Sequence, residues 1–297
     1  MPQPRTMPVA EVAVDPDLVR RLLTAQHPDL AGREITVLAN GWDNFICRIG
    51  EDLLVRLPRR ELGGRILRNE QRWLPVIAPR LPLAVPTPVR IGQPGAGYPW
   101  AWSITRFLPG EVAGRIPPAD PDQAAVTMGR FLAALHEPAP DDAPANPVRG
   151  VPLADRDQIV TQNMAILGDE IDQDLTKSLW TAARDTGRWD GPPLWLHGDL
   201  HPANILVHDG AISAVIDFGD ITAGDPAADL SVAWMLFPDP AHRDVFWAAY
   251  GKADDLTRAR ARGWALALSL VCQAYSADNP LMADIGRRAY RAVTQRA

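Results

Sequence analysis

Three polar residues in the second half of the chain have the types and spacing that phosphoryl transfer requires. Asp199 stands five positions before Asn204, and Asp217 follows thirteen positions after that amide. In phosphoryl transfer from a nucleotide, one carboxylate accepts the proton of the attacking hydroxyl, while an amide and a second carboxylate hold magnesium ions. The order D-x-x-x-x-N and then D-F-G matches a kinase catalytic loop and metal motif. We therefore expect Asp199 to be catalytic, and Asn204 and Asp217 to bind Mg²⁺.

The residues around Asp199 predict an irregular loop. Gly198 and Pro202 both oppose a continuing helix. His197 and His201 are four positions apart, which is the spacing of a zinc-binding pair on a helix. Because that pair needs a helix to bring both rings to one face, we expect the two histidines to brace and shape the loop.

A short hairpin is predicted directly after this loop. The apolar segments 205–207 and 214–216 flank Asp209-Gly210, a strong two-residue turn signal. Asn204 directly precedes the first strand of this hairpin, and Asp217 directly follows the second. Because the two strands run in opposite directions, the hairpin would bring both residues to the same end. The three polar side chains are therefore expected to converge.

The chain changes character near Leu108-Pro109-Gly110. Before that point, alternating apolar segments predict strands, and after residue 121 helical periodicity dominates. The expected strands of the first part are 34–39, 44–49, 53–57, 88–91 and 100–107, with helices at 16–26 and 62–77. The expected helices of the second part are 122–136, 156–167, 173–186, 225–236, 241–250, 255–274 and 280–294. We therefore expect a nucleotide-binding lobe over 1–110 and a helical lobe with the catalytic loop and substrate site over 111–297. Segment 138–152 reads as an irregular connection or flap.

The charge of the chain is uneven. The net charge is -6, with +4 over the first 110 residues and -10 over the remainder, counting Lys and Arg against Asp and Glu. A nucleotide would suit the first part, and a cationic substrate the second, although a merely solvated acidic surface explains the second equally well. The acidic balance argues against a nucleic-acid partner.

Cysteine usage and hydropathy favour the cytoplasm. Cys47 and Cys272 lack paired spacing, so no disulfide framework is expected. The longest nearly apolar run, 264–275, is too short to span a bilayer, so no membrane partner is expected. Nothing in the sequence indicates an oligomeric state.

Three runs together resemble the motifs of the aminoglycoside phosphotransferase family, which also includes macrolide kinases. They are HGDLHPANIL at 197–206, IDFG at 216–219 and GDPAADL at 224–230. The resemblance extends from residue 41 to the C-terminal helices. It implies an α+β, bilobal, protein-kinase-like fold and a kinase that acts on a small-molecule hydroxyl. It also implies that Asp229 caps a helix and braces the catalytic loop.

The resemblance implies a nucleotide site in the first lobe, on weaker signals. A reduced turn at 41–44 replaces a glycine-rich loop, and Arg56 stands where protein kinases have lysine. Arginine can still form a fork to phosphate or carboxylate oxygens. The expected nucleotide-binding residues are Asn44, Arg56, Glu70, Thr105, Arg106 and Phe107. Since backbone groups near 105–107 would read the base, both ATP and GTP remain possible donors.

The acceptor is the least determined part of the prediction. Carboxylates would pair with ammonium groups, and aromatic faces would stack on sugars or cations. The candidate substrate residues are Asp220, Asp225, Trp234 and Asp278. Trp234 lies in an apolar helical pattern typical of a core, and the three acids have the alternative of capping helices or lying at the surface.

Three functional hypotheses remain open from the sequence. The leading one is a kinase for an antibiotic such as an aminoglycoside or macrolide. A housekeeping kinase for a sugar or amino alcohol is the second. A catalytically silent kinase-like binding module is the third, supported only by Arg56 and the sparse glycine loop. The intact trio Asp199, Asn204 and Asp217 argues against the silent module.

Overall fold

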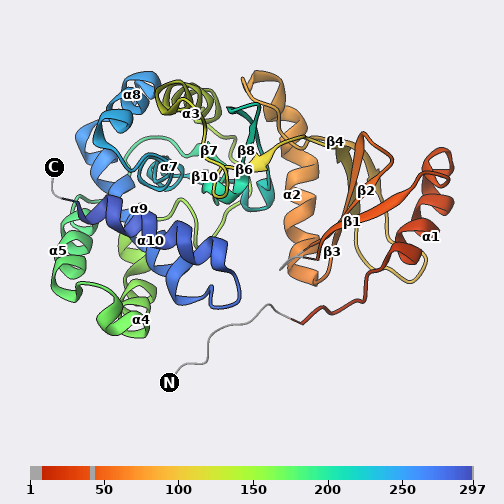
Figure 1. Cartoon of the computed structure of the whole chain (residues 1–297), viewed down its shortest axis with the longest axis horizontal. Helices are drawn as coiled ribbons and strands as arrows, with labels where there is room; N and C mark the ends of the chain where they lie inside the picture. The colour runs from red at the N-terminus through yellow and green to blue at the C-terminus, as the bar shows by residue number, and fades with distance from the viewer. Residues whose placement is uncertain (1–8, 41–43, 296–297) are drawn as a thin grey trace. The chain divides into compact units, whose positions relative to one another are not determined.

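The computed structural model describes residues 9–40 and 44–295 of the chain. These residues divide into two units. One unit contains the described residues up to Pro79 together with Ala84–Pro109, and is dominated by a sheet. The other contains Arg80–Leu83 and the residues from Gly110 onward, and is mainly helical (Figure 1).

The sheet unit has five antiparallel strands in the order β1-β2-β3-β5-β4. The strands are β1 (Ile35–Asn40), β2 (Asn44–Ile49), β3 (Leu53–Pro58), β4 (Pro88–Gly92) and β5 (Trp102–Arg106). Two helices belong to this unit, α1 (Pro16–Gln26) and α2 (Glu61–Ile77).

Helix α2 contacts β3, β4 and β5 through its apolar face. Leu67, Leu74 and Ile77 lie on that face, at the spacing of a helix with one buried side. Gly64 allows close packing, since a Cβ there would lie 2.9 Å from the ring of Trp100. The buried face of α2 also places Glu70, a charged residue, against the sheet.

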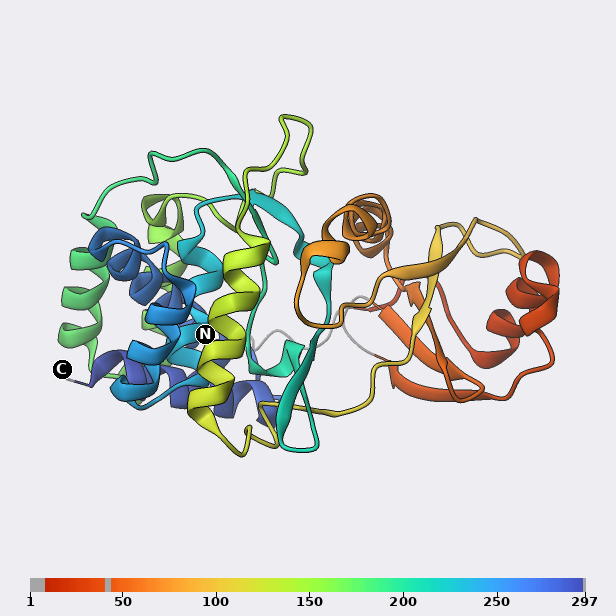
Figure 2. The same cartoon turned by 90° about the horizontal axis from the view of Figure 1, so that it is seen from above.

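The helical unit is organised around α9, whose 20 residues make it the longest helix in the part of the chain described. Asp254 caps its first turn by accepting a hydrogen bond from Thr257 N at 2.7 Å. The helices of the unit are α3 (Pro121–Leu135), α4 (Asp157–Leu167), α5 (Gln173–Arg184), α6 (Ala227–Leu230), α7 (Val232–Leu236), α8 (Pro240–Tyr250), α9 (Asp255–Ala274) and α10 (Pro280–Thr294). Helix α9 packs on α10, α4, α5 and α6, and α3 packs on α8 (Figures 1 and 2).

Two small antiparallel sheets in the helical unit flank the three motifs of the sequence. Strand β7 (Leu194–Leu196) pairs with β10 (Thr222–Gly224). Strands β6 (Glu111–Val112), β8 (Ile205–His208) and β9 (Ala211–Val215) form the other sheet. Asp209 and Gly210 both have positive φ, 50° and 78°, as the predicted tight hairpin turn requires.

The structure departs from the predicted elements at a few places. The helix expected over 225–236 is two short helices, α6 and α7, with Ser231 between them. The Ser231 hydroxyl donates to Ala228 O at 2.6 Å, which gives the backbone a local alternative to a continuous helix. Strands β6, β7 and β10 are too short to produce a periodic signal. None of the helices among the described residues combines the length and apolar character needed to cross a membrane.

Candidate active site

The loop with Asp199 runs from the end of β7 to the start of β8 and is fastened by Asp229. The carboxylate of Asp229 accepts from His197 N at 2.7 Å and from Gly198 N at 2.9 Å. Asp229 is fully buried on α6 and also faces His136 Nε2 at 3.3 Å. The bracing expected of Asp229 is therefore present. The expected helix capping by Asp229 is wrong, because Asp229 lies within α6, whose N-cap residue Pro226 has no side-chain capping bond. Just before α6, Asp225 Oδ1 accepts from Ala227 N at 2.9 Å.

His197 joins this loop to the strand that precedes the metal motif. Its Nδ1 accepts from Asp199 N at 3.2 Å, and its Nε2 donates to Ile216 O at 2.9 Å. These two partners fix the tautomer with the proton on Nε2. The ring also packs on Phe218, with centroids 4.5 Å apart. His197 therefore braces the loop, as expected.

The carboxylate of Asp199 has a basic partner at each oxygen. Arg149 Nη2 donates to Oδ1 at 2.5 Å, and His201 Nε2 lies 3.4 Å from Oδ2. Burial would raise the pKa of Asp199, but Arg149 and His201 outweigh burial and hold the pKa below its usual range. Asp199 is therefore ionised at neutral pH, the state that a proton acceptor needs.

Asn204 is directly joined to Asp199. The amide Nδ2 donates to Asp199 O at 2.9 Å, and Asn204 O accepts from Ile216 N at 2.9 Å. Because the amide nitrogen is used within the protein, the amide oxygen is the atom suited to a cation. The hairpin thus positions Asn204 at its start and Asp217 directly after its second strand.

Asp217 has a strained backbone. Its φ of 63° and ψ of 63° lie in the left-handed region, which residues other than glycine rarely adopt, and such strain is concentrated at functional sites. The donor set of an amide oxygen and a carboxylate fits the oxygen preference of Mg²⁺. Among residues 9–40 and 44–295, no group of three or more His, Cys, Asp or Glu side chains is placed to hold a metal. This set suits a metal that takes only one or two protein ligands and keeps its water or phosphate ligands.

The four candidate substrate residues lie in different environments. Asp220 accepts from Asn146 Nδ2 at 3.0 Å and faces Arg149 Nε at 3.4 Å. Burial raises the pKa of Asp220, and Arg149 opposes that rise. The structure thus brings Asp220 close to Asp199 through a shared guanidinium.

Asp225 and Trp234 are integrated into the helical core. Asp225 is almost fully buried and forms an ion pair with Arg260 Nε at 2.8 Å. Trp234 is also buried, in an edge-to-face contact with Trp247 at 5.7 Å between ring centroids. Asp278 lies on the exposed connection before α10.

The candidate nucleotide residues belong to the sheet unit. Arg56 Nη1 donates to Glu70 Oε2 at 2.6 Å, between β3 and α2. With the Asn44 amide oxygen turned toward β3, that oxygen accepts from Arg56 Nε and Nη2, both at 3.1 Å. The structure therefore brings these three residues together. Residues 41–43 of the predicted phosphate turn lie outside the described residues.

The stretch predicted to read the base lies at the end of β5. Thr105 is buried and Arg106 is exposed. Phe107 N donates to Asp52 O at 2.8 Å, and the guanidinium of Arg48 lies 4.3 Å from the centroid of the Phe107 ring. These contacts fix the path of the backbone immediately before the boundary between the two units.

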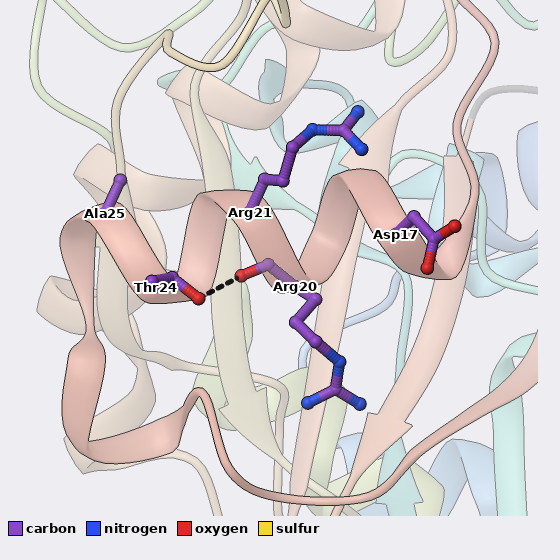
Figure 3. Close-up of a pocket in the computed structure, with 5 residues that line it drawn as sticks. All are labelled: Asp17, Arg20, Arg21, Thr24 and Ala25. Atoms are coloured by element: carbon purple, nitrogen blue, oxygen red, sulfur yellow. Dashed lines mark hydrogen bonds between the residues drawn. The ribbon is translucent and has the colours of Figure 1, made fainter.

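Two residues of the site were missed by the sequence analysis. Arg149 and Asn146 lie in the irregular connection between α3 and α4, where no periodicity or family motif marks them. A hollow on the surface of α1 is lined by Asp17, Arg20, Arg21, Thr24 and Ala25 (Figure 3). All five come from one helix, and Thr24 uses its hydroxyl to donate to Arg20 O at 2.8 Å. We assign no role to this hollow.

The fold is that of kinase-like phosphotransferases. The chain is similar to the apoenzyme of macrolide 2'-phosphotransferase MphH from Brachybacterium faecium, at 25% identity and a TM-score of 0.63, over 95% of this chain and 99% of that one. It is also similar in fold to wild-type aminoglycoside 2'-phosphotransferase-IIIa in its GDP complex, at 18% identity and a TM-score of 0.65, over 93% and 97% of the two chains. The predicted kinase-like α+β fold is confirmed.

The chain belongs to the phosphotransferase enzyme family, whose model matches residues 34–264. The family predicted from the three sequence motifs is therefore confirmed. Among curated proteins, homoserine kinase of Acidiphilium cryptum (strain JF-5) is 34% identical over 172 residues, which are 54% of this chain and 51% of that protein. The chain spans about half the length of the curated relatives it matches.

Proposed function

We propose that this protein is a kinase that transfers the γ-phosphate of a nucleotide to a hydroxyl group of a small molecule. The observation that carries this proposal is the hydrogen bond between Asn204 Nδ2 and Asp199 O, at 2.9 Å. This bond links Asp199, the candidate proton acceptor, directly to Asn204, a candidate metal ligand, at the start of the hairpin. The family of the chain supports the same reaction class.

Asp199 would accept the proton of the attacking hydroxyl. Its low pKa keeps it ionised but makes it a weak base in the ground state, so its contribution belongs to the transition state, when the hydroxyl proton becomes acidic. The loop that holds Asp199 is fixed by His197 and Asp229, so the carboxylate is preorganised. Preorganisation of this kind lowers the cost of reaching a productive geometry.

Asn204 and Asp217 would hold Mg²⁺ through oxygen. When bound, the metal neutralises charge on the phosphates during transfer. The left-handed backbone of Asp217 supports this assignment, because strain of this kind is concentrated at functional sites.

The nucleotide would be ATP or GTP. We propose Asn44, Arg56 and Glu70 for the phosphates and the backbone of 105–107 for the base. Support comes from the Arg56–Glu70 ion pair, in which a buried carboxylate orients a strand guanidinium. Glu70 and the Asn44 amide oxygen together fix the plane of this guanidinium, and a fixed planar guanidinium suits phosphate recognition.

Two acceptor classes are supported by different observations. The likeness to a macrolide kinase extends over 95% of the chain, which favours an antibiotic. The 34% identity to a homoserine kinase favours an amino alcohol, although it covers only 54% of the chain. Because Asp225 and Trp234 are buried, Asp220 and Asp278 are the stronger candidates for contact with an acceptor.

The function is tested by measuring nucleoside diphosphate release with Mg²⁺, using ATP and GTP in parallel. The acceptor panel contains aminoglycosides, macrolides, homoserine and other amino alcohols, and sugars, with Asp199→Ala as the blank. Stimulation by one class, absent in the blank, would support the kinase and identify its acceptor. Nucleotide binding that neither depends on Mg²⁺ nor leads to any phosphate release would favour the silent module.

We also propose the cytoplasm as the location of the protein. Cys47 and Cys272 are separate, buried thiols, which agrees with a reducing compartment.

A further inference from the structure

A short segment before α4, residues 144–150, is fastened along β10 at both ends; we call it the strap. At one end, Pro144 O accepts from Ala223 N at 3.2 Å and from the Thr222 hydroxyl at 2.8 Å. At the other end, Gly150 O accepts from Asp225 N at 3.0 Å. The strap therefore has a fixed position on the strand that follows the metal motif.

Two glycines allow the strap to approach this closely. Gly150 has a φ of 64°, and a Cβ there would lie 2.5 Å from Leu196 Cδ1. A Cβ on Gly224 of β10 would lie 2.4 Å from Gly150 O. Side chains at either position would force the strap away from β10.

Between its two fastened ends, the strap directs two side chains to the site. Arg149 Nη2 donates to Asp199 Oδ1 at 2.5 Å, and Arg149 Nε faces Asp220 Oδ2 at 3.4 Å. Asn146 Nδ2 donates to Asp220 Oδ1 at 3.0 Å. One guanidinium thus bridges two carboxylates that come from different loops.

We propose that Arg149 is a positioning residue that fixes the rotamer of Asp199 and leaves its Oδ2 as the atom that accepts the proton of the acceptor hydroxyl. The proposal rests on the proposed kinase function. A charge-assisted hydrogen bond of 2.5 Å occupies Oδ1. Oδ2 has only the longer contact, 3.4 Å to His201 Nε2, and the Asp199 side chain keeps 30% of its surface exposed. Oδ2 is therefore the less tightly held of the two oxygens.

Asp220 and Asn146 support Arg149 in this role. Without Asp220, the guanidinium would have one carboxylate and would follow the motion of Asp199. With it, the guanidinium is held from two sides. Gly198 further ties the two loops, because a Cβ there would lie only 2.2 Å from Asp220 O. The carboxylate of Asp199 is therefore oriented relative to both loops of the site.

The test uses water as the acceptor, so that no substrate need be known. Hydrolysis of MgATP and MgGTP is measured for the wild type, Arg149→Ala and Arg149→Lys, with Arg188→Ala as a control. Arg188 is exposed, before β7, and its loss removes the same charge. We expect Arg149→Ala to lower kcat about 10- to 100-fold, since misplacing a catalytic group by about 1 Å costs roughly 100-fold. KM for the nucleotide should stay within about twofold, Arg149→Lys should regain part of kcat, and Arg188→Ala should match the wild type.

The outcomes separate the positioning role from the kinase function. An active wild type with an equally active Arg149→Ala would overturn the role of Arg149 and leave the kinase intact. A loss confined to the nucleotide KM, or a loss equal in the Arg188→Ala control, would also overturn it. A wild type that transfers phosphate neither to water nor to any acceptor would contradict the kinase function itself.

A second measurement reports on the bridge without activity. In ¹⁵N-arginine-labelled protein, the Nε–H signal missing from Arg149→Lys identifies Arg149. We expect slow solvent exchange of this proton in the wild type and at least tenfold faster exchange in Asp220→Asn. Rapid exchange in the wild type would overturn the bridge, even if Arg149→Ala were inactive because it folds poorly.

Discussion

Asp229 Oδ2 accepts a hydrogen bond from the backbone nitrogen of His197 at 2.7 Å, across 32 positions of sequence. The other oxygen of the same carboxylate accepts from Gly198 N at 2.9 Å. Both bonds are buried, so solvent cannot replace them. The candidate catalytic loop is thus attached to α6 from the interior of the helical unit, in addition to the hydrogen bonds of its own turns.

Removal of this carboxylate should destabilise the protein. Asp229→Ala leaves two buried N–H groups without their acceptor, and each such group costs about 1–3 kcal/mol. We expect the free energy of unfolding in urea to fall by about 3 kcal/mol. Asp229→Asn keeps one acceptor oxygen and should lose less. Exposed Asp190→Ala is the control, and a loss as large in this variant would contradict the bracing role.

The same group predicts a dependence of stability on pH. Burial would raise the pKa of Asp229, but His136 and the backbone N–H of Gly198 outweigh burial and lower it. A carboxylate whose pKa is lowered in the folded state contributes stability above its unfolded pKa, near 3.9, and loses it as pH falls through the folded value. Urea unfolding from pH 6 down to pH 3 should therefore show a smaller loss of stability in Asp229→Asn than in the wild type. If stability fell equally with pH in the two proteins, the contribution of Asp229 to the pH dependence would be refuted.

Substitution of Asp199 should separate catalysis from nucleotide binding. Asp199→Asn keeps the shape of the side chain and removes its capacity to accept a proton. General base catalysis contributes about 10²–10⁴-fold, so turnover should fall within that range. The affinity for the magnesium nucleotide, measured by calorimetry, should remain within a few-fold of the wild type. Turnover at the parent rate would remove Asp199 from the mechanism.

Substitutions in the Arg56–Glu70 pair should affect stability and nucleotide affinity differently in a single and a double variant. Glu70 is fully buried, so Arg56→Met leaves a buried charge without this partner, a change that typically costs 3–5 kcal/mol. The double variant Arg56→Met with Glu70→Gln should recover much of this stability. It should not recover nucleotide affinity if Arg56 contacts phosphate. Thermal unfolding and nucleotide titration of the wild type and the two variants measure the two effects separately.

A methyl group at Gly198 should disturb the loop without removing any polar atom. Gly198 has a φ of 87°, and a Cβ would lie 2.2 Å from Asp220 O. Gly198→Ala should therefore lower turnover at least tenfold through displacement of the neighbouring Asp199. Gly187→Ala is a useful control, because Gly187 has a similar φ of 89° but has open space around its Cβ position. If Gly187→Ala lowered turnover as much as Gly198→Ala, backbone strain alone would explain the loss, and the close approach of Gly198 to Asp220 would not be needed.

The local elements of the site could be predicted because their signals are themselves local. Asp209-Gly210 predicts a turn since both residues tolerate positive φ, and the structure has that turn between β8 and β9. Helix α9 begins and ends as its periodicity predicts. Helices α6 and α7 were predicted as one, because the hydroxyl of Ser231 competes for the backbone in a way that periodicity does not record.

The sequence by itself determined the elements of the proposed site: the order of Asp199, Asn204 and Asp217, the loop that carries the first two and the hairpin that precedes the third. Tertiary structure alone decided which groups hold them. Arg149 meets Asp199 across 50 positions and Asp229 meets His197 across 32. A single arginine in an irregular segment has no periodicity, spacing or turn chemistry of its own. Its partner is set by where the strap is fastened on β10, and that depends on the packing of the whole helical unit.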